Sequence, residues 1–380
     1  MTGEARPTRS IRFKIDDDVR LARLPPRELY SDPQWCAAAR EAALAPAWHF
    51  LGEPGGLEAA GAARPLMLLP GSLDEPLLLL RDEQKRLRLM SNVCTHRGHL
   101  VVESAATLRS LRCTYHGRCF DLAGRCTGAP GFEKAAGFPS EAEALPQLSL
   151  VEWHGLLFGS LRPAAPWSEV VAAVERRLAG LAVTSWRHEP RHDRLFEFDA
   201  NWCLYVENYL EGLHIPFIHP ALNAKLDWKS YRYENLDHGT LQVGIAAPNE
   251  LAFDLPAGHP DQGSRVGALY FWLFPNLMVN VYPWGLSLNV VEPIGDARTR
   301  VRFHAFVHDE KLHDRGAGSG LVQVELEDER AAGQVQRGMA SRLYRSGRYA
   351  PEAESGVHHF HRMLARALAA RNVSSDHVGD

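Results

Sequence analysis

The sequence predicts an α+β protein in which a small all-β domain precedes a larger domain of strands and long helices. Residues 45–160 contain short apolar runs separated by turn residues, a pattern typical of antiparallel strands. Residues 161–166 contain two prolines and indicate a linker. Residues 161–380 combine strand-like runs with two stretches of helix formers, so we place a second domain there. We expect residues 1–44 to pack on that second domain.

The first domain is expected to consist of short strands that end in tight turns. The runs are apolar and brief, and Ala123-Gly124 supplies a turn between two of them. The predicted strands are 77–80, 87–90, 108–112, 119–122 and 155–158.

The second domain is expected to wrap strands around long helices and to enclose a pocket. Helix formers are frequent over 319–343, and residues 354–371 place apolar side chains at helical spacing. Prolines punctuate three consecutive strand-like runs. The other predicted elements are helices over 168–181 and near 201–214, and strands over 194–200, 266–275, 277–283 and 286–293.

Length and composition favour a globular protein with small-molecule and protein partners. A chain of 380 residues with 45% hydrophobic content can bury two cores. The net charge of -4 gives no electrostatic footprint for nucleic acid. No apolar run reaches the roughly 18 residues of a membrane span, and the N-terminus has no apolar signal core. We therefore expect a soluble, cytoplasmic protein that binds neither nucleic acid nor membrane.

Two short cysteine–histidine pairs, separated by sixteen residues, are the strongest chemical signal. Two thiolates and two imidazoles match a Rieske [2Fe–2S] cluster, which relays single electrons. A structural zinc site is the main alternative, but zinc fingers usually pair cysteine with cysteine, whereas each pair here has one residue of each type. Gly98 and Gly117 suit tight loops whose amides approach the cluster sulfurs. The predicted ligands are Cys94, His96, Cys113 and His116.

The other cysteines show no second metal spacing. A chain of this length does not need disulfides, so we expect buried small hydrophobes or surface thiols. These residues are Cys36, Cys119, Cys126 and Cys203.

A second chemical signal lies between residues 201 and 219. On a helix, Asn208, Glu211 and His214 would share one face. Pro216 should end that helix and allow His219 to turn back toward His214. Two imidazoles so placed need one carboxylate to complete the 2-His-1-carboxylate triad of mononuclear iron(II) oxygenases, which leaves open positions for O2. A histidine pair alone is more often structural, but a one-electron relay in the same chain requires an acceptor.

Together the two motifs resemble the alpha, or terminal oxygenase, subunits of Rieske non-haem iron oxygenases. The resemblance covers nearly the whole chain. It implies an all-β Rieske domain over 45–160 and a helix-grip (START-like) catalytic domain over 161–380, with an antiparallel sheet around long helices. It also implies two cofactors, a Rieske [2Fe–2S] cluster and a mononuclear Fe(II).

The resemblance further implies roles for individual residues. The family's third iron ligand is an aspartate near the start of a late helix, which we carry to Asp328. Glu325, Glu327 and Glu329 are competing choices, and a solvated acidic helix face is the alternative without a metal. The family also places an acidic residue three before the first iron histidine, where it connects to a cluster histidine of the neighbouring subunit. In this chain that residue is Glu211, and we expect Asn208 to assist it.

The substrate prediction follows from a narrower resemblance. Glu211, residues 274–280 and residues 344–361 are most similar to choline monooxygenase and to carnitine and betaine oxygenases. This implies a quaternary amine held by aromatic faces, with an aromatic ring dioxygenase as the alternative. Aromatic residues in strands are more often plain core. The predicted substrate-binding residues are Tyr209, Phe217, Asn280, Tyr282 and Trp284, and Tyr270 and Trp272 are further cage candidates.

Two positions depart from the family pattern, and one histidine cluster invites a second metal site. Leu213 replaces the usual tyrosine before the first iron histidine, and Arg118 replaces the usual tryptophan after His116-Gly117. These changes should alter the pocket and the cluster surroundings, respectively. We interpret His358, His359 and His361 as packing residues, because their spacing does not converge on a carboxylate.

The resemblance also implies the partners and the course of electrons. No Gly-x-Gly-x-x-Gly element lies in a strand–helix setting, so electrons should come from a separate flavin or ferredoxin-type reductase. They would pass through His116, Glu211 and His214 to the iron, where O2 is used to hydroxylate or dealkylate a small substrate. A head-to-tail homotrimer is expected. An electron-transfer ferredoxin and a pocketed binding protein with a structural metal are the rival functions.

Overall fold

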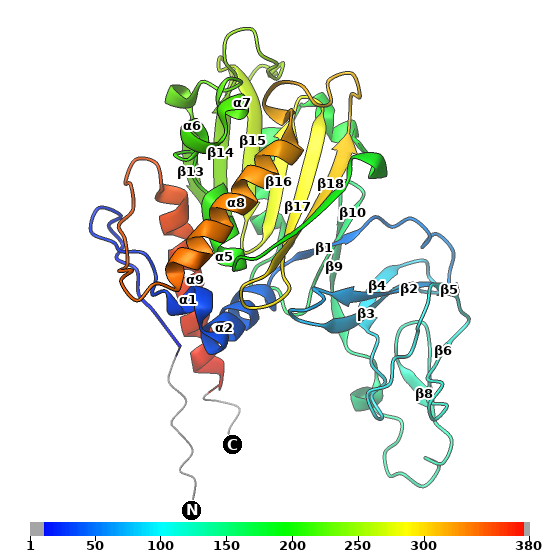
Figure 1. Ribbon diagram of the computed structural model, residues 1–380. Coiled ribbons are helices and arrows are strands. Elements are labelled where there is room, and N and C mark those ends of the chain that lie inside the picture. The colour runs from blue at the N-terminus through cyan, green and yellow to red at the C-terminus, as the bar shows by residue number, and fades with distance from the viewer. Residues whose placement is uncertain (1–10, 376–380) are drawn as a thin grey trace, which may run out of the picture. The chain divides into compact units, whose positions relative to one another are not determined.

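The computed structural model, which describes residues 11–375, divides into two compact units (Figure 1). One unit comprises residues 45–164, and the other joins residues 11–44 to residues 165–375. The division between residues 164 and 165 falls inside the proline-containing segment 161–166. Both units contain antiparallel sheets, and long helices occur in the second, so the predicted α+β class is confirmed.

The unit of residues 45–164 contains two antiparallel sheets and no α-helix among its described residues. Its larger sheet has the order β1-β10-β9-β4-β3-β2-β5. These strands are β1 (His49–Gly52), β2 (Ala62–Leu68), β3 (Glu75–Arg81), β4 (Leu87–Ser91), β5 (Ala106–Thr107), β9 (Gln147–Trp153) and β10 (Leu156–Ser160). The smaller sheet contains β6 (Leu111–Arg112), β7 (Cys119–Phe120) and β8 (Cys126–Gly128), and a 3₁₀ turn, η1 (Glu141–Glu143), follows it.

The second unit is built on one antiparallel sheet of order β11-β18-β17-β16-β15-β14-β13, with β12 also pairing with β18. Its central strands are buried along almost their whole length because helices cover one face. The strands are β11 (Arg187–His188), β12 (Arg194–Phe198), β13 (Arg232–Leu236), β14 (Gly239–Ile245), β15 (Val266–Leu273), β16 (Leu277–Tyr282), β17 (Gly285–Pro293) and β18 (Thr299–Val307).

Two helices, α5 and α8, run across one face of this sheet, and α2 and α9 pack side by side at its lower end (Figure 1). The packing of α2 on α9 brings the N-terminal segment against the C-terminal helix. The helices are α1 (Glu28–Ser31), α2 (Pro33–Leu44), α3 (Trp167–Val170), α4 (Ala172–Leu178), α5 (Trp202–Tyr209), α6 (Ile215–Ile218), α7 (Pro220–Asn223), α8 (Leu321–Met339) and α9 (Ser355–Ser375). The 3₁₀ turns are η2 (Ala182–Ser185), η3 (Pro190–His192), η4 (Trp228–Ser230) and η5 (Gly316–Gly318).

The core of this unit lies between the helices and the end of the sheet. Phe360 of α9 is fully buried and packs edge-on against Trp202 of α5 and Trp272 of β15, with ring centroids 6.0 and 5.3 Å apart. Edge-to-face packing of buried aromatic rings adds to the stabilisation from burial. This aromatic cluster holds α5 and α9 in place, so it also positions the segment that follows α5.

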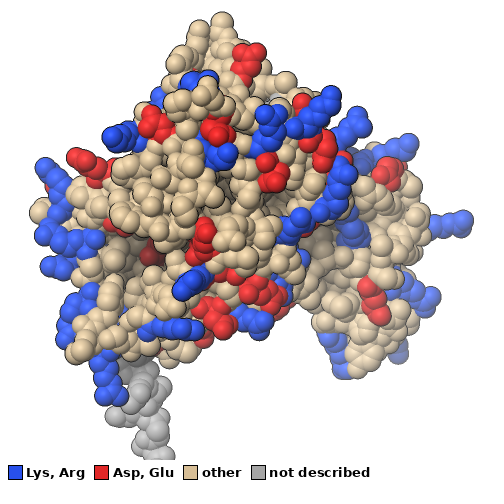
Figure 2. Space-filling view, turned by 45° about the horizontal axis from the view of Figure 1, so that its top comes forward, with Lys and Arg blue, Asp and Glu red and all other residues tan. Residues whose placement is uncertain are grey.

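Acidic and basic side chains are interspersed over the visible face instead of forming a field of one sign (Figure 2). None of the described helices combines the length and the apolar character that crossing a bilayer would need.

Candidate functional site

Two matched loops carry the predicted cluster ligands in the unit of residues 45–164. The Gly98 amide donates to the Cys94 carbonyl and the Gly117 amide donates to the Cys113 carbonyl, both at 3.0 Å. Gly98 and Gly117 also share a φ of +73°, which residues with a Cβ rarely adopt. Each glycine therefore lets the chain turn back directly after a cysteine–histidine pair.

The four side chains at these loops fit a Rieske cluster. Cys94 and Cys113 are each only 2% exposed, whereas His96 and His116 are half-buried, with ring centroids 4.8 Å apart. Burial raises the pKa of the Cys94 thiol, and the neighbouring Cys113 raises it further. Buried thiols beside one another become thiolates when a cation binds them. One sulfur pair and one imidazole pair correspond to the two irons of a Rieske centre.

Arg118, which stands where the family usually has tryptophan, is buried beneath these loops. Its guanidinium lies over Phe132 at 5.0 Å and Phe138 at 5.2 Å, and it donates to Thr95 Oγ1 at 3.1 Å. Phe132 in turn packs edge-on against His96. A fixed positive charge therefore lies next to the segment that carries Cys94 and His96.

In the second unit, the helix that was predicted near 201–214 ends at Tyr209, which corrects that prediction. Gln242 of β14 donates to the Tyr209 carbonyl at 2.6 Å, so it takes the place of the next turn. The Glu211 carboxylate then accepts hydrogen bonds from the Leu213 and His214 amides. Because these amides bond to a side chain, the backbone turns away from the helix.

Pro216 begins the next helix instead of ending the first. It lies in the first turn of α6, where a missing N–H breaks no hydrogen bond. His214 immediately precedes α6 and His219 immediately follows it. The short helix therefore presents both histidines toward the same side, with ring centroids 5.0 Å apart.

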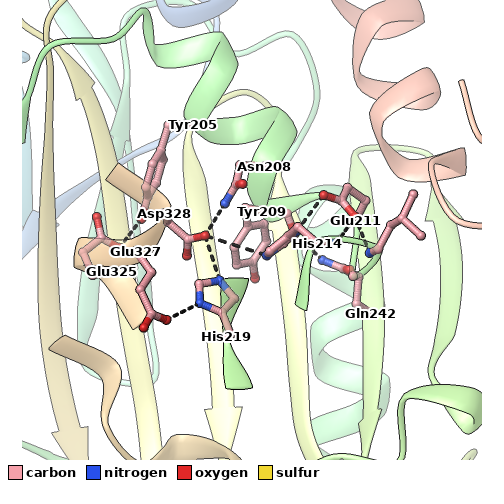
Figure 3. Close-up of polar contacts among 12 residues, drawn as sticks. Tyr205, Asn208, Tyr209, Glu211, His214, His219, Gln242, Glu325, Glu327 and Asp328 are labelled. Atoms are coloured by element: carbon pink, nitrogen blue, oxygen red, sulfur yellow. Dashed lines mark hydrogen bonds and ion pairs between the residues drawn. The ribbon is translucent and has the colours of Figure 1, made fainter. Parts of the chain in front are cut away.

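The two imidazoles converge on Asp328 of α8 (Figure 3). The distances from Asp328 Oδ1 to His219 Nε2 and His214 Nε2 are 2.9 and 3.7 Å. The opposite ring nitrogens are also paired: His214 Nδ1 lies 2.6 Å from Glu211 and His219 Nδ1 lies 2.7 Å from Glu327. A carboxylate at Nδ1 makes that nitrogen the hydrogen-bond donor, so Nε2 carries the lone pair. Both Nε2 lone pairs therefore face the Asp328 oxygen. The same arrangement occurs in carboxylate–histidine–metal sites.

This arrangement needs a positive charge between its groups. Burial lowers the pKa of His219, but Asp328 and Glu327 together raise it above its ordinary value. A proton would satisfy only one of the two Nε2 atoms, whereas a divalent metal would satisfy both imidazoles and the carboxylate. The three residues, with nitrogen and oxygen donors and open directions toward a cavity, fit a mononuclear iron.

The other acidic residues of α8 contact groups other than the two Nε2 atoms. Glu325 is 3% exposed and accepts a hydrogen bond from the Tyr205 hydroxyl at 2.6 Å. Burial raises the pKa of Glu325 well above its ordinary range, although the hydrogen bond from Tyr205 opposes that rise. Burial and the Asp328 charge also raise the pKa of Glu329. Since Glu327 contacts the far nitrogen of His219, Asp328 is the acid of this helix that both imidazoles approach.

A cavity of about 100 Å³ opens onto this triad. Asn208, which donates to Asp328 Oδ1, is also in its wall. Of the predicted substrate residues, Tyr209, Asn280 and Tyr282 line the cavity, and the Tyr209 hydroxyl donates to Asn280 at 2.6 Å. Tyr270, the further cage candidate, also lines it. The wall also includes residues that were not predicted as site residues, among them Tyr205, Tyr231, Gln242, Ser287 and Phe303.

Three predicted cage residues lie elsewhere, which corrects those predictions. Phe217 is 80% exposed because Ile215 and His219 occupy the inward side of α6, and Phe217 lies on its other side. Trp272 points to the same face of β15 as Tyr270 but packs on α9, beyond the cavity. Trp284 stacks behind Tyr282 with centroids 5.1 Å apart and lines a neighbouring hollow instead.

The remaining histidine and cysteine predictions concern packing. His358 and His359 each bond to a backbone carbonyl at 2.8 Å, and His361 bonds to Tyr349 and Glu207. Their partners lie in different directions, as expected for packing residues, but His361 does contact the carboxylate of Glu207, which the spacing did not predict. Cys36 and Cys203 are buried, and Cys119 and Cys126 are half-buried; each is a free thiol.

Comparisons with known proteins agree with both sites. Residues 67–139 match the Rieske [2Fe-2S] domain and residues 183–370 match the ring hydroxylating alpha subunit (catalytic domain). The carnitine monooxygenase oxygenase subunit of Escherichia coli (strain K12) is 30% identical, over 78% of this chain and 82% of the relative. Choline monooxygenase of Beta vulgaris is 26% identical, over 95% of this chain and 81% of the relative. A solved quaternary ammonium Rieske monooxygenase shares the fold, with a TM-score of 0.71 and 23% identity over 92% of this chain and 96% of that structure.

Proposed function

This chain belongs to the alpha subunits of Rieske-type ring-hydroxylating oxygenases, and we propose that it oxidises a small cationic amine that carries no carboxylate. Its class follows from the family: it is a Rieske non-haem iron oxygenase that uses O2. Its cofactors are a Rieske [2Fe–2S] cluster and a mononuclear iron. The substrate class rests on one observation, the composition of the cavity wall.

The residues available for the two cofactors lie in different units. Cys94, Cys113 and the two paired histidines would hold the cluster, and His214, His219 and Asp328 would hold the iron. When bound, these groups supply one-electron transfer and the reductive activation of O2 for attack on a C–H bond. We assign the cluster to residues 45–164 and catalysis to residues 165–375.

The protein's own side chains would orient the reacting groups. Glu211 and Glu327 hold the two imidazoles by their Nδ1 atoms, so that both Nε2 atoms face the cavity side. Asn208 donates to Asp328 and thereby fixes the direction of its carboxylate. The Tyr205 hydroxyl donates to Glu325, and burial raises the pKa of that carboxyl group, which disfavours a second negative charge beside Asp328.

The cavity wall favours a cationic substrate. Tyr231 and Tyr270 stack at 6.5 Å, and Tyr282 meets Tyr270 edge-on at 5.9 Å, so their π-faces border one space. Burial raises the pKa of all three phenols, which therefore remain neutral. Neutral aromatic faces bind ammonium groups by cation–π attraction. The described residues that line the cavity include no Lys or Arg, so a substrate carboxylate would find no charged partner.

Binding of an isosteric pair tests this proposal. Choline and 3,3-dimethylbutan-1-ol have nearly the same shape, but only choline is charged. We expect calorimetric titration of the holoenzyme to detect choline-like cations and not the neutral isostere. Tyr270→Leu should weaken cation binding on the order of tenfold, whereas Phe217→Leu, outside the cavity, should not. Equal binding of both ligands, or tighter binding of an aromatic acid, would favour the aromatic ring dioxygenase alternative.

Turnover requires partners that we propose from the family resemblance. A separate flavin or ferredoxin-type reductase would deliver electrons singly to the cluster. The chain would work as a homotrimer in which Glu211 connects the iron histidine His214 to His116 of the next subunit. Oxidation of a carbon attached to nitrogen would then either leave an alcohol or release that carbon as a carbonyl compound.

A further inference from the structure

A second group of two histidines and one carboxylate lies outside the catalytic cavity, on β18 and the segment that pairs with its edge. The register places these residues together. His188 of β11 pairs with Phe306, so its diagonal neighbour on the same face is His304. Arg194 of β12 pairs with Phe303, so the preceding residue, Asp193, lies opposite His304. The 3₁₀ turn η3 joins these two pairings.

The donor atoms of this group repeat the geometry of the iron triad. Asp193 Oδ2 lies 2.9 Å from His188 Nε2 and 3.6 Å from His304 Nδ1. The corresponding distances at Asp328 are 2.9 and 3.7 Å. In both groups all three donor atoms lie within 4.8 Å of one another. We propose that His188, Asp193 and His304 form a second metal site that takes a divalent transition metal of the zinc class.

The surroundings of this second triad suit a metal. The Ala305 amide donates to Asp193 Oδ1 at 3.0 Å and so fixes the carboxylate while Oδ2 faces the imidazoles. Arg302, two residues before His304 on the same face of β18, is held by Glu292 at 3.0 Å. Two imidazoles and one carboxylate with room for water make a common zinc ligand set.

A neighbouring cluster lacks these features and serves as a comparison. His192, Glu310 and His313 also lie close together, but Arg191 binds Glu310 at 3.0 Å. The Glu310 side chain is 49% exposed, and His313 stacks on His192 with ring centroids 3.8 Å apart. A guanidinium already neutralises this carboxylate, so a cation gains less by binding there.

Zinc binding to the holoenzyme tests the site. We expect equilibrium dialysis against buffered Zn²⁺ to show one zinc per chain that persists in His219→Ala, in which the iron triad is broken. Asp193→Asn should weaken that binding at least about tenfold, whereas Glu310→Gln should not. Zinc-edge X-ray absorption should report about two imidazole ligands, with Zn–N distances near 2.0–2.1 Å. Zinc should also raise the thermal midpoint of the wild type and not of Asp193→Asn.

The opposite outcomes have defined meanings. If Asp193→Asn keeps full zinc affinity, or if only Glu310→Gln loses it, the assignment to His188, Asp193 and His304 is overturned. Absence of zinc uptake by folded, cluster-loaded wild type would show that these three residues only hydrogen-bond β11 to β18. None of these results depends on turnover, so they are independent of the substrate proposal.

Discussion

The two nitrogens of each iron-triad imidazole have different partners. Asp328 lies at the Nε2 atoms, whereas Glu327 lies at Nδ1 of His219, so the two acids have different roles. Asp328→Ala removes the oxygen that both Nε2 atoms face. We expect loss of the mononuclear iron and of turnover, with an unchanged cluster spectrum. Glu327→Gln leaves that oxygen in place and weakens only the partner of His219 Nδ1, so iron affinity should fall about 10–100-fold. Metal analysis and the visible spectrum measure both effects. Iron lost completely from Glu327→Gln but retained in Asp328→Ala would reverse the assignment.

The buried Arg118 should tune the cluster. A positive charge near the cluster stabilises the reduced form, which carries one more negative charge. Arg118→Gln should therefore lower the reduction potential, on the order of tens of millivolts. Arg118→Lys keeps the charge and should shift the potential less. A redox titration followed by electron paramagnetic resonance measures both. Equal shifts in the two variants would mean that the packing between Phe132 and Phe138, and not the charge, sets the potential.

At the scale of residues, the sequence predicted the metal-ligating side chains but not most of the residues that hold them in position. Cysteine and histidine spacing identified Cys94 and His116, because few residue types bind these metals. Tyr231 and Gln242 enter the cavity from segments with no chemical motif, and only the closed sheet brings them there. Phe217 was selected as an aromatic residue between the two iron histidines, but residue type does not reveal on which side of α6 a side chain lies, and Phe217 is exposed.

At the scale of elements, the end of α5 at Tyr209 shows why the geometry of the site could not be predicted from local sequence. Residues 210–214 have ordinary helix formers among them, but Gln242 and the Glu211 side chain capture the groups that the next turn would use. The Gln242 side chain comes from β14, more than 30 residues later in the chain. The helix propensities of single residues do not account for such long-range contacts. In contrast, the apolar runs bounded by prolines were sufficient to predict strands over 266–275 and 277–283, where β15 and β16 lie. The strand β18 was not predicted, although its first residues alternate between buried and half-buried positions.

A buried ion cluster joins α4 to β13 and to the loop before β15. Asp261, 3% exposed, accepts from Arg177 Nε and from Arg232 Nη2, both at 2.7 Å. Asp261→Ala would remove the carboxylate that both guanidinium groups share and leave Glu234 as the remaining ion-pair partner of Arg177. The expected loss is about 3–5 kcal/mol, or a fall on the order of ten degrees in the thermal midpoint. Asp18→Ala removes an exposed partner of Arg20 and should leave the midpoint unchanged. Similar midpoints for both variants would contradict the stabilising role of the buried cluster.

At the scale of the whole molecule, the two metal sites occupy separate compact units of one chain. The sequence predicted both units from the change in element type at the proline-containing segment. It also led us to expect the N-terminal residues beside the second domain, and the contact of α2 with α9 is compatible with that arrangement. Nothing in the spacing of cysteines and histidines says whether electrons pass within a chain or between chains, because that depends on the assembled surface.

Mixed oligomers decide whether transfer runs between chains. A chain with Cys94→Ala cannot hold the cluster and a chain with His219→Ala cannot hold the iron, so each homo-oligomer should be inactive. In a head-to-tail ring the cluster of one subunit would face the iron of the next, and a mixed ring therefore contains one competent pair. We expect oxygen uptake to reappear after the two variants are dissociated and reassembled together. Two affinity tags recovered on the same particles verify mixing.

Adding Glu211→Gln to the chain that keeps the iron should cut the restored rate at least about tenfold, because it removes the charge that faces His214. Verified mixing without activity, or full activity from a monomer, would show that each chain passes electrons to its own iron.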